Sequence, residues 1–201
     1  MKKDIRNDKE LLDHLVSVIS SQRFLHKEGI GNEVPFFICP YEINKHVEIT
    51  KLVSQLVNQL SRSGVTVLHI NLYDKALEIL RTRGLLDKII QEEKSLSKDQ
   101  LKELLQNTLD VEKYLVPEIK KEIDANGYDV LFLTGIGEVF PYIRSHNVLY
   151  NLQSKAKDQP TILFFPGDFM FSQEKGAVLN LFGRLHDDNY YRAFNILHYE
   201  A

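Results

Sequence analysis

The composition of this 201-residue chain is that of an ordinary globular protein, with 43% hydrophobic and 26% charged residues. Its length suits one sizeable core, so we expect a single domain over residues 1–201. The formal net charge of -3 excludes a protein that acts mainly by neutralising nucleic-acid phosphates, because that activity needs a strong basic excess.

The cysteine content and the absence of long apolar runs bear on where in the cell the protein is found. One cysteine, Cys39, forms no internal disulfide and supplies no multi-cysteine zinc site, which favours a reducing environment. The charged residues 1–15 lack the apolar stretch of a secretory signal, and no run approaches the roughly 18 apolar residues of a membrane span. We therefore expect a cytoplasmic protein without a membrane partner.

Helical and strand-like patterns alternate along the first part of the chain. Apolar residues at helical spacing predict a short helix around residues 11–19, and the apolar run 34–39 predicts a first strand. The strongest helical stripe runs from Ile49 to Leu60, and Gly64 follows where a C-terminal cap belongs. Residues 65–72, rich in β-branched side chains, predict a second strand.

A helical insertion is predicted after the second strand, at approximately residues 73–126. It is broken at Gly84 and again before Ser97, which matches a capping box with Gln100 three positions later. Pro117 is expected to start or kink its last helix. Charges of alternating sign along these helices indicate a solvated surface.

The remaining chain predicts three more strands. Residues 129–135 predict the third strand, and a helix over 139–153 follows with Pro141 in its first turn. Residues 159–167 predict the fourth strand, and the last lies near 190–197. Apolar strands separated by helices indicate an α/β fold: a three-layer αβα domain with a mostly parallel sheet of about five strands. It is expected to resemble the scaffold of a P-loop NTPase without the phosphate-binding loop.

The loops after these strands lack the residues that hold a nucleotide phosphate. Such a loop aims backbone N–H groups and a helix N-terminus at the anion, with Lys on the phosphates and Ser or Thr on the metal. The segment 40–46 after the first strand has no glycine and carries Glu42. After the third strand, Gly135 and Gly137 come without a Gly-Lys-Ser/Thr sequence and with a carboxylate at Glu138. We expect no bound cofactor here and interpret the glycines as a tight strand-to-helix turn.

Two groups of charged and aromatic residues are the candidates for binding. Arg144, near the carboxyl end of the sheet, suits an anion or a partner protein. The second group shares one C-terminal segment and consists of Arg184, Asp187, Asp188, Asn189, Tyr190, Tyr191 and Arg192. The paired aspartates suit a hard metal, but adjacent acids point apart on a strand and are also common in turns, so we expect no metal. Arginines among tyrosines resemble a protein-interface hot spot or a surface that stacks on nucleic acid.

Two blocks of the sequence are the most specific: GEVFPYIRSHNVLYNLQ at residues 137–153 and FGRLHDDNYYRAF at 182–194. A further block is GIGNEVPFFI at 29–38. With others, in order along nearly the whole chain, they resemble the BrxB family of small proteins from BREX bacterial anti-phage systems. The resemblance implies a component of a multi-protein system that modifies host DNA and blocks phage replication. Its neighbours in that system are a large ATPase, an adenine methyltransferase and the alkaline-phosphatase-like protein PglZ. The resemblance supplies no catalytic residues.

Three functions stay open at this point. The first is a non-enzymatic adaptor that docks onto another BREX protein such as PglZ and supports host DNA methylation and phage exclusion. The second is an enzyme, either a degenerate nucleotide hydrolase that uses the loop at residues 134–138 or a metal-dependent nuclease that uses Asp187 and Asp188. In it Glu138 would be a base, and Arg144 or Arg184 an anion clamp. The third is direct DNA or RNA binding through the Arg/Tyr-rich C-terminal segment, with DNA contacted within the assembly. We favour the adaptor, without catalytic residues.

Overall fold

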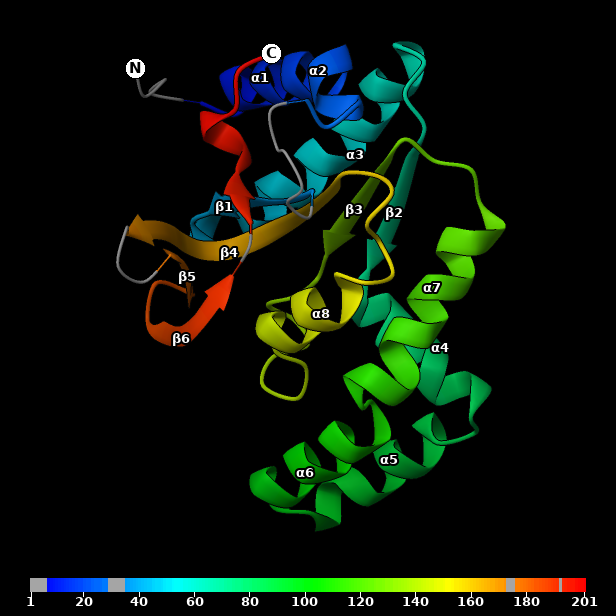
Figure 1. Cartoon of the computed structure of the whole chain (residues 1–201). Coiled ribbons are helices and arrows are strands. Elements are labelled where there is room, and N and C mark those ends of the chain that lie inside the picture. The colour runs from blue at the N-terminus through cyan, green and yellow to red at the C-terminus, as the bar shows by residue number, and fades with distance from the viewer. Residues whose placement is uncertain (1–6, 29–34, 173–175, 192) are drawn as a thin grey trace.

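A computed structural model describes residues 7–28, 35–172, 176–191 and 193–201, which form a sheet between two layers of helices (Figure 1). Its strands are β1 (Phe36–Tyr41), β2 (Val67–Asn71), β3 (Val130–Thr134), β4 (Thr161–Ser172), β5 (Gly176–Leu181), β6 (Leu185–Tyr191) and β7 (Phe194–Asn195). Its α-helices are α1 (Asp8–Ile19), α2 (Gln22–Leu25), α3 (His46–Arg62), α4 (Leu72–Thr82), α5 (Leu86–Glu92), α6 (Lys98–Thr108), α7 (Val116–Ala125) and α8 (Ser145–Leu152). Short helical turns are η1 (Ile43–Lys45), η2 (Glu93–Ser95), η3 (Val111–Leu115) and η4 (Ile196–His198).

Five strands form a parallel sheet in the order β2-β3-β4-β1-β7. The prediction of an α/β fold with a mostly parallel sheet of about five strands is confirmed. β4 is longer than predicted: beyond Pro166 it leaves the parallel sheet and pairs in antiparallel fashion with β5, which pairs with β6. The strand predicted near residues 190–197 is divided, because β6 pairs with β5 while β7 pairs with β1.

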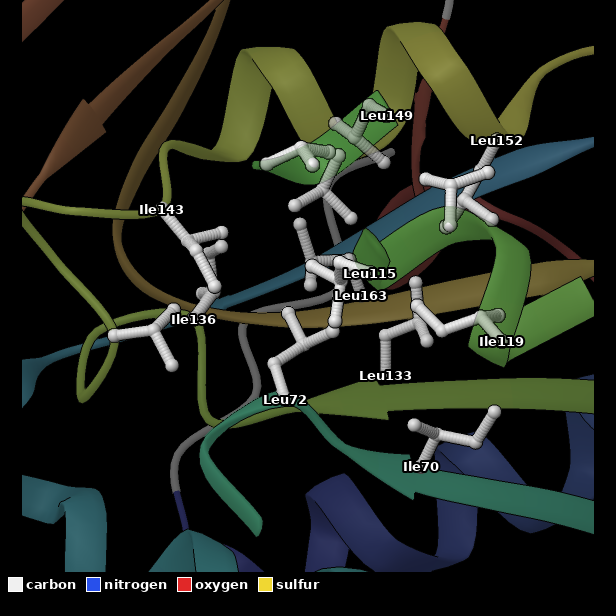
Figure 2. Close-up of a cluster of buried hydrophobic side chains, with 14 of the residues drawn as sticks. Ile70, Leu72, Leu115, Ile119, Leu133, Ile136, Ile143, Leu149, Leu152 and Leu163 are labelled. Atoms are coloured by element: carbon white, nitrogen blue, oxygen red, sulfur yellow. The ribbon is translucent and has the colours of Figure 1, made fainter. Parts of the chain in front are cut away.

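The two faces of the sheet carry separate hydrophobic cores, because its central strands are apolar on both faces. Phe132 of β3 and Phe164 of β4 belong to a core with α1, α2 and α3. Their chain neighbours Leu133 and Leu163 belong to the other core, with α4, α7 and α8 (Figure 2). Successive side chains of a strand point to opposite faces, so β3 and β4 each contribute to both cores. The prediction of three layers is therefore confirmed.

Between β2 and β3 the chain forms a mostly helical arm. α4 and α7 pack on the sheet through buried residues such as Leu72 and Ile119, whereas α5 and α6 bury no residue fully and extend away from the sheet (Figure 1). The predicted capping box is present: the Ser97 hydroxyl accepts a hydrogen bond from the Gln100 backbone, and the Gln100 side chain accepts one from the Ser97 backbone. Pro117 lies in the first turn of α7, as predicted.

The segment between β3 and α8 differs from the prediction. The sequence predicts a helix from residue 139 with Pro141 in its first turn, but α8 begins only at Ser145. The preceding residues form turns that include a cis peptide bond before Pro141. Three apolar side chains of these turns, those of Ile136, Val139 and Ile143, are buried in the core under α8. The apolar spacing in this segment therefore reflects side chains that reach the core from turns, and not a helix.

A buried ion pair joins α4 to α7. Lys75 is 8% exposed, and its ammonium lies against the carboxylates of Glu78 and Glu122. Burial disfavours the charged ammonium, but hydrogen bonds to Glu122 and Glu78 outweigh this effect and raise the pKa of Lys75. Lys75 thus links α4 to α7, the two helices of the arm that pack on the sheet.

Lys75→Ala is expected to lower the free energy of unfolding by about 2 kcal/mol, because it removes the packing of the buried lysine stem together with the ion pairs to Glu78 and to the half-buried Glu122. Lys121→Ala, which breaks the exposed pair with Glu118, is the control and should cost about 0.5 kcal/mol or less. Urea unfolding near neutral pH measures both, and equal effects would contradict the assignment. Since the pKa of Lys75 is raised on folding, its contribution is complete below its ordinary value of 10.5 and is lost as the pH rises through the raised value.

Candidate functional site

The carboxyl ends of the parallel strands meet at one edge of the sheet, which is where α/β proteins usually bind their ligands. Two pockets lie at this edge. The first, here called the edge pocket, has a volume of about 310 Å³ and is lined by Ile43, His46, Gly137, Glu138, Pro166 and Phe182. The second, here called the arginine pocket, has a volume of about 270 Å³ and includes Arg144 and Arg184 in its lining. Phe140 of the arginine pocket contacts Phe182 of the edge pocket edge to face, with ring centroids 6.1 Å apart.

Three polar side chains contact one another in sequence beside the edge pocket, and two of them, His46 and Glu138, line it. The Tyr41 hydroxyl lies 3.0 Å from Nδ1 of His46, and Nε2 of His46 lies 3.4 Å from Oε1 of Glu138. Burial, and after it the charge of Glu138, raises the pKa of Tyr41, so its hydroxyl stays protonated and can donate to His46. These contacts join the end of β1 and the start of α3 to the loop after β3. Glu138, a predicted binding residue, therefore lies against His46.

Both glycines of the loop after β3 lie against protein atoms. Gly135 has a φ of +79°, and a Cβ there would lie 2.4 Å from Oδ1 of Asn71, the atom that caps α4. A Cβ on Gly137 would lie 2.8 Å from Pro166 and 3.1 Å from Phe182. The loop thus needs glycine for left-handed backbone at one position and for close packing at the other. These contacts account for both glycines without a phosphate.

The arginine pocket brings together two predicted binding residues from distant parts of the sequence. Arg144 directly precedes α8, and Arg184 lies in the turn between β5 and β6. Both side chains are exposed, and within residues 7–28, 35–172, 176–191 and 193–201 neither forms an ion pair with a carboxylate. Ser145, next to Arg144, also lines the pocket.

The other predicted residues lie on β6 or just after it. The strand contains Asp187, Asp188, Asn189, Tyr190 and Tyr191. The turn before it ends at Arg184, so the paired aspartates do not lie in a turn. Their side chains, and Arg192 as a whole, lie outside the residues that the structure describes. Within the described part, no group of three or more His, Cys, Asp or Glu side chains is placed to hold a metal ion. No helix of that part has both the length and the apolar character to cross a membrane.

Tyr41, His46, Phe140 and Phe182 are site residues that the sequence analysis does not single out. A signal for the first two exists, because side chains that follow the first and third strands of a parallel sheet gather at the same edge. Tyr41 and His46 flank the loop after β1, and could have been paired with Glu138 on that ground. The place of Phe182 depends on the antiparallel extension of β4, for which the sequence has no comparable signal.

The comparisons with known proteins agree with one another. A family model described as BREX protein BrxB matches residues 68–196. A BREX protein BrxB from Bacillus cereus (strain H3081.97) is 33% identical over 197 residues, covering 96% of this chain and 99% of that protein. Another, from Escherichia coli O9:H4 (strain HS), is 28% identical over 186 residues, covering 92% of this chain and 90% of that protein. No solved structure matches the chain significantly, so the resemblance to a P-loop NTPase scaffold stays a prediction.

Gly135→Ala is expected to lower the free energy of unfolding by about 2 kcal/mol, since the new Cβ meets both a left-handed backbone and the cap of α4. Gly84→Ala, at a φ of +65° but in open space, should cost about 1 kcal/mol. Gly127→Ala has neither feature and is the control, with a change within about 0.5 kcal/mol. Thermal unfolding ranks the three variants, and a different order would refute the packing account of Gly135.

Proposed function

The chain belongs to the BrxB family of BREX proteins, and from that premise we propose that it is a non-enzymatic adaptor that binds a partner protein of its BREX system, such as PglZ. As such it would support host DNA methylation and phage exclusion by holding enzymes of the system together. The binding surface in this proposal is the carboxyl edge of the sheet, with the edge pocket, the arginine pocket and the β6 segment beside them. The large ATPase and the adenine methyltransferase are further candidate partners.

The arginine pair at the arginine pocket is the observation that carries this proposal. Arg144 and Arg184 are exposed and have no carboxylate partner among the described residues, and apolar side chains lie between them. Arginine is enriched at the residues that dominate binding energy in protein interfaces, and such interfaces combine an apolar centre with a polar rim. The arrangement therefore suits a protein surface better than a small polar substrate.

The packing of the loop after β3 at the same edge supports an adaptor rather than an enzyme. A nucleotide hydrolase needs backbone N–H groups, a lysine and a metal-binding hydroxyl converging on one anion. Here Gly135 and Gly137 pack on protein atoms, and Glu138 lies against His46. Tyr41, whose hydroxyl lies 3.0 Å from Nδ1 of His46, has a raised pKa and is a weak nucleophile.

The adaptor proposal predicts that the chain and PglZ of the same system, mixed at micromolar concentrations, elute together in size-exclusion chromatography. A specific protein interface of standard size gives a dissociation constant at or below this range. Mixing the chain with an unrelated protein of similar size and charge is the control. Independent elution of the chain and PglZ would remove this partner from the proposal.

The enzyme alternative requires that the chain binds a nucleotide or a metal ion. Thermal unfolding with ATP and Mg²⁺, and with Mn²⁺ alone, tests this binding. A ligand at about 100 times its dissociation constant stabilises the folded state by about 2.7 kcal/mol. We expect no shift with either, because the loop after β1 has no glycine and the two glycines of the loop after β3 pack on protein atoms. A reproducible shift that Glu138→Gln abolishes would favour the enzyme instead.

A further inference from the structure

The floor of the arginine pocket is part of the hydrophobic core. Phe165 of β4 and Leu179 of β5 are fully buried, and Leu181 is nearly so. Phe140 adds an aromatic side from the loop before α8. At about 270 Å³ the pocket lies below the range of about 300–1,000 Å³ that is typical of small-molecule and cofactor sites. It is a recess with an apolar floor, of a size for one or two inserted side chains.

The rim of this recess is cationic. Arg144, just before α8, and Arg184, in the turn between β5 and β6, both line it, and no carboxylate of a described residue pairs with either. The N-terminus of α8 opens at the same place; its first turn carries no acidic residue, and no side chain caps it. The unpaired N–H groups of a helix N-terminus attract negative charge. Exposed Leu185 extends the apolar surface between the two arginines.

A hydroxyl in the wall of the pocket can take part in binding. Ser145 is 8% exposed and lines the pocket, and its hydroxyl forms no hydrogen bond with any residue that the structure describes. A serine hydroxyl both donates and accepts hydrogen bonds. The Ser145 hydroxyl beside Arg144 can therefore donate to an acceptor that enters the pocket.

From these three features we propose that the arginine pocket binds an acidic segment of a partner protein, with one large apolar side chain of that segment in the recess and its flanking carboxylates on Arg144, Arg184 and Ser145. The inference rests on the proposed adaptor function and names the chemistry of the segment that is bound. Arginine and carboxylate pair through two parallel hydrogen bonds, which adds direction to the charge attraction. An inorganic phosphate or a DNA backbone would satisfy the rim but leave the apolar floor without a partner.

The double variant Arg144→Glu/Arg184→Glu tests the rim, and Leu185→Asp tests the apolar surface between the arginines. We expect the first to weaken the binding of PglZ at least about 30-fold, because it replaces attraction by repulsion at a contact that excludes water. Arg62→Glu is the matched control, since Arg62 is exposed at the end of α3, far along the helix from the carboxyl edge, and binding should stay within about twofold. Thermal unfolding of each variant shows that it is folded.

The nature of the segment is tested with arrays of short overlapping peptides that span PglZ, the large ATPase and the adenine methyltransferase. We expect the wild-type chain to bind acidic peptides with a large apolar residue, and the double variant to bind none of them. Inorganic phosphate and a labelled DNA duplex are tested alongside. If phosphate or DNA alone showed the same arginine dependence, or if no acidic peptide bound, the inference would be overturned.

The two proposals fail in different ways. If PglZ bound the wild type and the double variant equally, the pocket inference would be wrong while the adaptor function remained. If PglZ did not bind at all, but arginine-dependent acidic peptides came from the ATPase or the methyltransferase, the pocket would stand and the named partner would be wrong.

Discussion

The pairing of β4 is the constraint on which the rest of this structure depends. Its first half lies between β1 and β3 and is buried on both faces, so it belongs to both hydrophobic cores. Its second half continues past the parallel sheet and pairs with β5. The change of partner occurs at Gly167, where φ is +155° and a Cβ would lie 2.0 Å from the carbonyl oxygen of Asn180. A side chain at that position would separate β4 from β5.

This extension of β4 shapes the candidate site. It places Pro166 and Phe182 beside the loop after β3, which completes the edge pocket. It also places Leu179 and Leu181 over Phe165, which forms the floor of the arginine pocket. The antiparallel strands thus cover part of the carboxyl edge of the sheet. In a simple parallel sheet this edge would be open. What remains is a surface of shallow recesses and arginines, which suits recognition of another protein.

The sequence predicts well wherever the pattern is local. Alternation along β3 and β4 and the helical stripe of α3 follow from the periods of strand and helix, so the layers could be predicted. Cys39, in the apolar run of β1, is buried, and burial raises the pKa of its thiol to about 12. The predicted start of the helix at residue 139 is wrong, because Val139 and Ile143 are apolar at helical spacing yet reach the core from turns, and α8 begins at Ser145.

The amino-acid sequence by itself determined the fold class, the capping box of α6 and the family, because each rests on short-range pattern or on residues compared one by one. Tertiary structure alone decided which side chains meet at the candidate site. Arg144 and Arg184 carry no periodic signal, and they line one pocket only because β5 folds back on β4 and α8 starts beside it. Contacts between distant segments depend on how the strands pair, and strand pairing is set by burial across the whole sheet rather than by neighbouring residues.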